Sequence, residues 1–360
     1  MKKQHVLTLL LLWAVLTGFA WFSPAKAMSD SERRPLAQLP ALQLESISNG
    51  KFMKDFVSYM TDQFPLRNEF RRLKANVLFN VYQQKDNGGV YIQDGYASKI
   101  DAKINMESVD HFIGRMDNLY NSYIKDTECK VYFSAIPDKN YFLAEKGGYP
   151  AMDYEELYRV LGDKLSYMTN IDIRYLLEIS DYYTTDTHWK QECIVDVANY
   201  IREQIGMEAV NDYESKSAGD FYGVYYGQSA LNLDPDEIIY LENEEIKSAE
   251  AYIYETDKTV PIYNLEKLDA MDHYDIFLSG AISLIKITNP LGDEGKKLVV
   301  FRDSFSSSLT PLLMSGYSEI ILIDTRYINP VMMSRYVEFT NQDVLFLYST
   351  LVINSSSQIK

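Results

Sequence analysis

Histidine, tryptophan, cysteine and basic residues are all scarce in this sequence of 360 residues. It contains 35 Lys and Arg against 51 Asp and Glu, a formal net charge of −16. Such a balance excludes a nucleic-acid-binding protein, because neutralising phosphates needs a basic surface. Two cysteines are too few for a disulfide framework. Cys129 and Cys193 could form one pair, but two buried free thiols are the simpler interpretation.

The positions of the four histidines argue against a metal site. None of them lies at ligand spacing from another, so we expect no metal centre and no cofactor. The hydrophobic fraction of 46% and charged fraction of 24% are typical of globular proteins, and they exclude a disordered chain. His188 and Trp189 bring two of the rare residue types together, because the other tryptophans, Trp13 and Trp21, both lie near the N-terminus.

The first 27 residues have the form of an export segment. Lys2 and Lys3 precede an apolar run over residues 6–22, and Ala25 and Ala27 form a small-x-small cleavage site. The run of 17 residues exceeds the ~7–15 of a usual signal and approaches the ~17–25 of a spanning helix. A cleaved signal is the preferred interpretation, with a retained anchor as the alternative. Either way, we expect a secreted or cell-envelope protein whose residues 28–360 function outside the cytoplasm, with membrane contact through the N-terminal segment alone.

The rest of the chain indicates an α/β domain. Residues 28–50 are polar and contain Pro35 and Pro40, which favours a linker. Over 51–360, apolar strand-like runs alternate with amphipathic helical segments, a pattern typical of parallel βαβ units. Residues 213–275 hold nine tyrosines and short alternating segments, which predicts a small antiparallel insertion. The clearest predicted strands are 130–136, 171–173, 298–301, 319–323 and 343–347; the clearest predicted helices include 154–168, 305–314 and 330–339.

Ser304 is the first candidate for chemistry. It follows the predicted strand 298–301 and precedes a predicted helix, and α/β proteins place their sites at such strand ends. A serine there exposes its hydroxyl, and the backbone N–H groups at the start of the helix can stabilise an oxyanion. The alternative is that Ser304 or Asp303 only caps the helix.

Asp186 and His188 form the second candidate. Residues two apart in an extended segment point to the same side, so the carboxylate can orient the imidazole. The other ring nitrogen is then free to take a proton from Ser304, as a Ser-His-Asp site requires. A structural histidine is the plainer alternative for this short motif.

Several motifs, in order, resemble the DHHW family of exported bacterial proteins, which are SGNH-hydrolase-like and related to the alginate O-acetyltransferases. The resemblance covers most of the chain, and two motifs carry it above all: Asp186-Thr187-His188-Trp189 and Asp303-Ser304-Phe305. Its further blocks are Asp62–Arg67 (DQFPLR), the hairpin Val90–Tyr96, Phe221–Tyr226 (FYGVYY), Tyr274–Gly280 and Asp324–Tyr327 (DTRY).

The resemblance implies an SGNH-like, flavodoxin-like parallel sheet flanked by helices, with a circularly permuted motif order. It implies that Ser304 is the nucleophile, His188 the base and Asp186 its orienting acid. Gly280, Arg302 and Tyr226 become candidate oxyanion or substrate-binding residues. The sequence also departs from the family pattern: Thr187 replaces the first His of the motif, Arg302 stands where the esterases have Gly, and Ala281 stands where an oxyanion Asn is expected.

These features predict a serine-dependent O-acyltransferase or esterase acting on acyl, chiefly acetyl, esters of cell-envelope or exopolysaccharide sugars. The intermediate would be an acyl-Ser304 ester. A glycan is the expected partner, and the resemblance adds a membrane-bound O-acyltransferase as acyl donor. The alternative is a catalytically inert envelope protein that keeps the fold and binds glycan or a protein partner, which Ala281 favours.

Overall fold

The computed structural model describes residues 3–22, 24–29 and 31–360. Its chain contacts divide into two compact units. The first unit comprises residues 1–90 and 226–233, and the second comprises residues 91–225 and 234–360. The α/β unit therefore starts near residue 91, whereas we expected its domain to start at residue 51.

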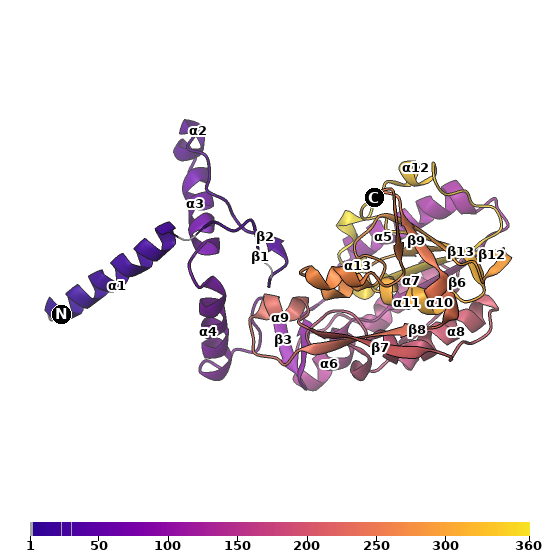
Figure 1. The fold of residues 1–360 in the computed structure, drawn as a ribbon, viewed down its shortest axis with the longest axis horizontal. Coiled ribbons are helices and arrows are strands. Elements are labelled where there is room, and N and C mark those ends of the chain that lie inside the picture. The colour runs from indigo at the N-terminus through magenta and orange to yellow at the C-terminus, as the bar shows by residue number, and fades with distance from the viewer. Residues whose placement is uncertain (1–2, 23, 30) are drawn as a thin grey trace. The chain divides into compact units, whose positions relative to one another are not determined.

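The second unit is built on one eight-stranded sheet (Figure 1). Its strand order is β10-β9-β11-β13-β12-β14-β5-β6. The five strands from β13 to β6 run parallel, whereas β11, β9 and β10 continue the sheet with antiparallel pairings. The strands are β5 (Lys130–Ile136), β6 (Thr169–Asn170), β9 (Glu250–Ile253), β10 (Lys258–Pro261), β11 (Leu284–Thr288), β12 (Asp293–Arg302), β13 (Tyr317–Ile323) and β14 (Asp343–Ser349).

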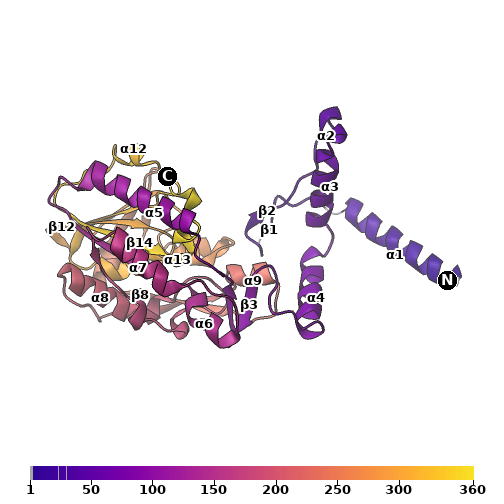
Figure 2. The ribbon, with the colours of Figure 1, turned by 180° about the vertical axis from the view of Figure 1, so that it is seen from behind.

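Alternate residues of the parallel strands fill two cores, one on each face of the sheet. Leu298 and Val300 of β12 pack with α8 and α11, while Val299 and Phe301 pack with α5 and α7. This alternation is the period-two pattern of strands. Figures 1 and 2 show the helical layers from opposite sides. The main helices are α5 (Met106–Leu119), α6 (Lys139–Gly147), α7 (Tyr154–Lys164), α8 (Val195–Ile205) and α11 (Ser306–Leu313); shorter ones are α10 (Glu244–Ser248), α12 (Pro330–Met333) and α13 (Thr350–Ile353).

The predicted fold class is confirmed: an α/β protein with a large, mostly parallel sheet, covering helices and small antiparallel additions. Within 213–275, β7 (Glu214–Phe221) and β8 (Asp236–Glu242) form a separate antiparallel pair. The strands β9 and β10 of this segment instead extend the main sheet. The expected hairpin joins β3 (Val90–Gln93) and β4 (Tyr96–Lys99) through a turn at Asp94 and Gly95.

Three predicted elements were wrong in extent. The strand expected at 171–173 lies at Thr169–Asn170. The helix expected over 154–168 ends at Lys164, and the helix expected over 330–339 ends at Met333. The chain leaves this helix early, and Phe339 stacks on Phe301 at 6.1 Å, where it is buried beside β12. Cys129 and Cys193 are free thiols, as expected, but both are half-buried instead of fully buried.

The first unit is mainly helical (Figure 1). It contains α1 (Lys3–Phe22), α2 (Leu44–Ser48), α3 (Lys51–Asp62), α4 (Arg67–Asn80), the strand pair β1 (Met28–Ser29) and β2 (Arg34–Pro35), and most of α9 (Val224–Ser229). Across the described part of the chain, no helix combines the length and apolarity needed to cross a membrane. Of the predicted export segment, Met1, Lys2 and Ser23 lie outside the described residues. Whether this segment is cleaved or retained stays a prediction.

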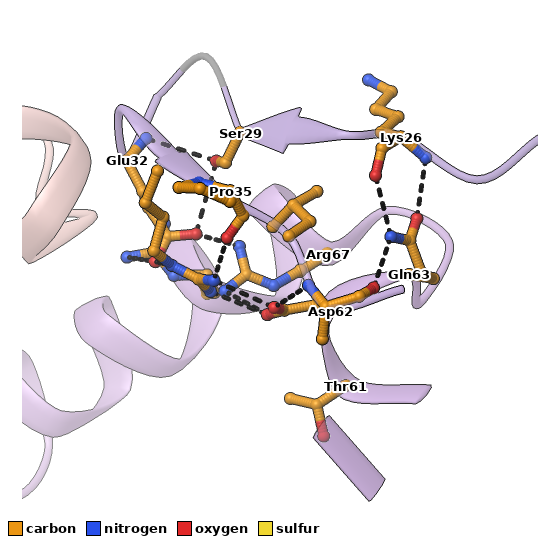
Figure 3. A network of polar contacts seen from close by, with 12 residues as sticks. Lys26, Ser29, Glu32, Pro35, Thr61, Asp62, Gln63 and Arg67 are labelled. Carbon is orange, nitrogen blue, oxygen red and sulfur yellow. Dashed lines mark hydrogen bonds and ion pairs between the residues drawn. The ribbon is translucent and has the colours of Figure 1, made fainter. Parts of the chain in front are cut away.

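The DQFPLR block holds the segment that follows the predicted export segment (Figure 3). Asp62 accepts two hydrogen bonds from Arg34, at 2.7 and 2.9 Å, and one from the Ala37 backbone. The Gln63 amide group donates to the Lys26 carbonyl and accepts from the Lys26 N–H, both at 2.9 Å. Arg34 lowers the pKa of Asp62 to about 2. This part of the expected linker is therefore fixed within the first unit.

Candidate active site

Ser304 lies on the turn between β12 and α11, at the carboxyl end of a central parallel strand. The buried carboxylate of Asp303 fixes this turn. It accepts a hydrogen bond from the Phe305 N–H at 3.0 Å and another from the Ser349 N–H, at the end of neighbouring β14, at 2.7 Å. Ser304 itself is half-buried, so its hydroxyl can meet a substrate.

The structure brings Ser304, His188 and Asp186 together in one hydrogen-bonded chain. His188 Nε2 lies 2.8 Å from Ser304 Oγ, and His188 Nδ1 lies 2.6 Å from Asp186 Oδ1. The Asp186 carboxylate is fully buried, and its Oδ2 accepts the Val224 N–H at 2.8 Å. Because Asp186 accepts at Nδ1, it selects the tautomer that leaves Nε2 to accept a proton from the serine.

Two oppositely charged buried side chains hold the loop that carries Asp186 and His188. Lys139 Nζ donates to the carbonyls of Tyr183, Thr184 and Asp186, at 2.7, 3.1 and 2.8 Å. Asp236 accepts from the backbone N–H groups of Thr184 and Thr185, both at 2.7 Å, and from both threonine hydroxyls. The loop thus finds buried partners for its backbone donors and acceptors, which would otherwise be costly.

Lys139 fills three carbonyl acceptors, which only its ammonium form can do. Burial lowers the pKa of Lys139 to about 7, while the charges of Asp186 and Asp236 oppose that shift and Lys190 adds to it. The aromatic rings of Tyr96 and Tyr225 lie 5.7 and 5.4 Å from the ammonium and add cation–π contacts.

A glycine allows the neighbouring segment to approach Asp186. A Cβ on Gly223 would lie 2.3 Å from both Cα and Cβ of Asp186, so no larger residue fits without displacing the loop. The Gly223 N–H donates to Thr185 Oγ1 at 2.8 Å, and the next N–H, of Val224, reaches the Asp186 carboxylate. Tyr225 completes the pairing by donating its N–H to the Thr185 carbonyl and its hydroxyl to Thr187.

Aromatic residues fix the imidazole and the helix beside it. The Tyr274 ring stacks on His188 with a centroid distance of 3.9 Å and an interplanar angle of 5°. Trp189 is fully buried, and its indole N–H donates to the Phe305 carbonyl and to Ser308 Oγ, both at 3.0 Å. The residue after His188 therefore binds the turn that carries Ser304.

The backbone N–H groups of Gly280 and Ser304 differ in whether they are free to bind an oxyanion. The Gly280 N–H donates to the Phe277 carbonyl at 3.3 Å, within a loop whose φ is +54° at Leu278, +63° at Ser279 and +87° at Gly280. By contrast, the backbone N–H of Ser304 has no acceptor among the described residues. The Ser304 N–H therefore remains available for an oxyanion.

The buried side chain of Arg302 packs against the loop at 278–280. Its side chain is 1% exposed, and its guanidinium faces the carbonyls of Gly280 and Ile282 at 3.5 and 3.3 Å and Ser307 Oγ at 2.6 Å. It therefore holds the loop instead of facing solvent. Tyr226 falls in the first unit, where the Arg72 guanidinium lies 5.6 Å from its ring centre.

Sequence reasoning missed Lys139, Asp236, Gly223 and Tyr274. Gly223 and Tyr274 lie in blocks that carried the family resemblance, and that was the one signal available for them. Lys139 and Asp236 carry no local motif, because their partners lie about 45 to 50 residues away along the chain. Within the described residues, no group of three or more His, Cys, Asp or Glu could hold a metal ion.

Asp186, His188 and Ser304 thus form one site in this chain order, with Ser304 at the end of a parallel strand of an α/β sheet. The fold is similar to that of the DHHW family protein from Eubacterium siraeum, with a TM-score of 0.61, 21% identity, and coverage of 76% of this chain and 95% of that one. It is also similar to that of Bacillus cereus PatB1, with a TM-score of 0.58, 18% identity, and coverage of 73% of this chain and 96% of that one. The resemblance to the DHHW family is thus confirmed at the level of the fold.

PatB1 has also been solved with a sulfonyl adduct, and that structure matches with a TM-score of 0.59, 18% identity, and coverage of 73% of this chain and 95% of that one. A scan against protein-family models and a search of curated proteins gave no match.

Proposed function

We propose that this protein is an extracytoplasmic serine-dependent O-acyltransferase or esterase that acts on acyl esters of envelope or exopolysaccharide sugars. The observation that carries the proposal is the buried hydrogen-bonded chain from Asp186 through His188 to Ser304. The shared fold with PatB1, which has been solved with a sulfonyl adduct, supports it.

The geometry supports a two-step acyl transfer. Ser304 Oγ attacks the acyl carbonyl carbon as its proton passes to His188 Nε2, and the imidazolium then gives this proton to the departing alkoxide. An acyl-Ser304 ester remains. In the second step an acceptor hydroxyl, from a sugar or from water, gives its proton to His188 and attacks the ester, and Ser304 regains a proton as it leaves. Asp186 stays ionised and stabilises the imidazolium.

The Ser304 N–H is available for the oxyanion that forms in each step, because no described residue accepts its hydrogen bond. A second donor is missing from the side chains at the expected position, since Ala281 has none. Losing one such donor costs roughly 10²–10³-fold in rate. This feature favours the second candidate function, a protein that binds glycan or a protein partner through this fold without turnover.

Covalent labelling distinguishes the two functions. The full chain is treated with a fluorophosphonate probe, and the labelled residue is identified by mass spectrometry. We expect wild type to be labelled at Ser304, Ser304→Ala to remain unlabelled, and His188→Ala to label far more slowly. Equal labelling of wild type and Ser304→Ala, or no labelling of wild type, would contradict a nucleophilic Ser304 and support the binding function.

The acceptor is tested separately. Incubating the labelling-competent protein with an acetyl ester and an oligosaccharide acceptor yields acetylated sugar from a transferase and free acetate from an esterase. A membrane-bound O-acyltransferase is the proposed acyl donor. Co-purification of such a protein with the full chain, and its loss without residues 1–27, would test that partner.

A further inference from the structure

Helices α3 and α4 of the first unit expose an unusual amount of apolar surface. None of the 12 residues of α3 is buried. Met53, Val57, Leu66 and Leu73 are 58%, 59%, 66% and 60% exposed. Soluble monomers rarely expose contiguous apolar patches of large size, and such patches mark interaction sites.

A groove of about 720 Å³ lies within this surface. Met53, Met60 and Phe70 contribute to its lining, together with the basic side chains of Arg67, Arg71 and Lys74. Phe64, in the turn between the two helices, and Phe70 of α4 also line the groove, with ring centres 5.5 Å apart in an edge-to-face arrangement. Apolar side chains also stand beyond the groove, at Val81 and Tyr82, which are 69% and 72% exposed. The exposed apolar side chains therefore extend beyond the groove.

The charge of the chain is strongly divided between its two units. Of the 35 Lys and Arg, 12 lie in the first unit and 23 in the second; of the 51 Asp and Glu, 7 lie in the first unit and 44 in the second. The net charges are thus +5 and −21. The exposed apolar face belongs to the basic unit, so its surroundings attract anions although the whole chain is acidic.

We propose that α3 and α4 dock on an anionic lipid surface. The apolar side chains of Met53, Val57 and Leu73 enter the boundary between headgroups and acyl chains, and exposed Lys54 and Lys74 face the anionic headgroups. Basic helices with an opposite Phe, Leu and Met face bind bilayer interfaces in this way. The breadth of the apolar surface favours a lipid surface over a groove-bound helix, and the charge of the unit favours anionic lipid.

A fluorophore on the docking face tests the proposal in the full chain, because it reports on α3 whatever α1 does. In a C129S/C193S background, an NBD label is placed at V57C and, as a matched control one residue away, at S58C. Emission is recorded with vesicles of phosphatidylglycerol and phosphatidylcholine mixed equally, and with vesicles of phosphatidylcholine alone, at physiological salt. We expect a blue shift for the label at position 57 with the anionic vesicles, and little change at position 58.

Charge variants complete the test. Each lysine near an anionic surface adds about fivefold to affinity, so K54Q/K74Q should weaken the vesicle titration about 25-fold. K146Q/K164Q, which removes the same charge from exposed positions of the second unit, should leave it unchanged.

Three results would overturn the proposal. The first is an unchanged label at position 57 on protein that co-sediments with anionic vesicles. The second is a label that is already buried without vesicles, which would show the face covered by another part of the chain or by a second copy. The third is an equal blue shift with phosphatidylcholine alone that K54Q/K74Q does not weaken, because the recognition would then not be anionic.

Discussion

Asp236→Asn keeps the size of the side chain but replaces one of the two oxygens that accept hydrogen bonds from the buried loop of Asp186 and His188. The carboxylate of Asp236 accepts four hydrogen bonds, at 2.5 to 2.8 Å, from the N–H and hydroxyl groups of Thr184 and Thr185. In either orientation, the amide NH₂ of Asn would face one backbone N–H donor. That donor would be buried without an acceptor, which costs about 1–3 kcal/mol, and the remaining bonds would lose their charge assistance, about 1 kcal/mol more.

We therefore expect Asp236→Asn to lower the free energy of unfolding by about 2–4 kcal/mol. With a urea dependence near 3 kcal/mol/M, the urea midpoint would fall by about 1 M. Displacing the loop by about 1 Å should also slow fluorophosphonate labelling of Ser304 by up to about 10²-fold. Asp234→Asn, at an exposed position two residues earlier, is the matched control. If Asp236→Asn unfolds at the midpoint of this control and labels at the wild-type rate, the loop does not depend on the carboxylate.

Three further predictions concern the same loop. Asp186→Asn should slow Ser304 labelling roughly 10³–10⁴-fold in protein that still folds, because the imidazole loses the partner that sets its tautomer; labelling within tenfold of wild type would contradict the triad. Gly223→Ala should lower the free energy of unfolding, measured in urea, by about 1–3 kcal/mol because the new Cβ clashes with Asp186. Gly162→Ala in α7 is the control, because no atom lies within 4 Å of its new Cβ, and it should not lower the free energy of unfolding. Burial lowers the pKa of Lys139 from 10.5 to about 7, so between those pH values the unfolded chain binds a proton that the folded chain has lost. The stability of wild type relative to Lys139→Met should therefore rise with pH across that window, and a pH-independent difference would refute the lowered pKa.

Much of the fold was predictable because its elements carry strong local patterns. The strand at 130–136 and the strands at 298–301, 319–323 and 343–347 are apolar, β-branched runs, and each appears in the central sheet. The helix at 330–339 was overpredicted, because the spacing of Met333 and Val337 fits a helix, although α12 ends at Met333 and Val337 is buried after the chain has turned away. The division into two units carries no local pattern and was missed.

The contact among Asp186, His188 and Ser304 followed from two short motifs and from their place at a strand end. The residues that hold the Asp186–His188 loop could not be predicted in this way. They are Lys139 and Asp236, whose only signal is burial of charge in the folded state. The expected oxyanion role of Gly280 also depended on the direction of one N–H group, which is set by the left-handed loop at 278–280. The sequence patterns therefore indicated which residues come into contact, but they did not indicate the direction of each hydrogen bond.

The position of Trp189 gives the protein an internal optical reporter. Its indole is shielded from water and bonded to the segment after Ser304, while Trp13 is 68% exposed. Iodide should quench the emission of an exposed indole and spare that of Trp189, whose spectrum then depends on the packing around Phe305. Acylation of Ser304, or loosening of the His188 loop, could thus be followed by intrinsic fluorescence in real time, without a reporter group on the substrate.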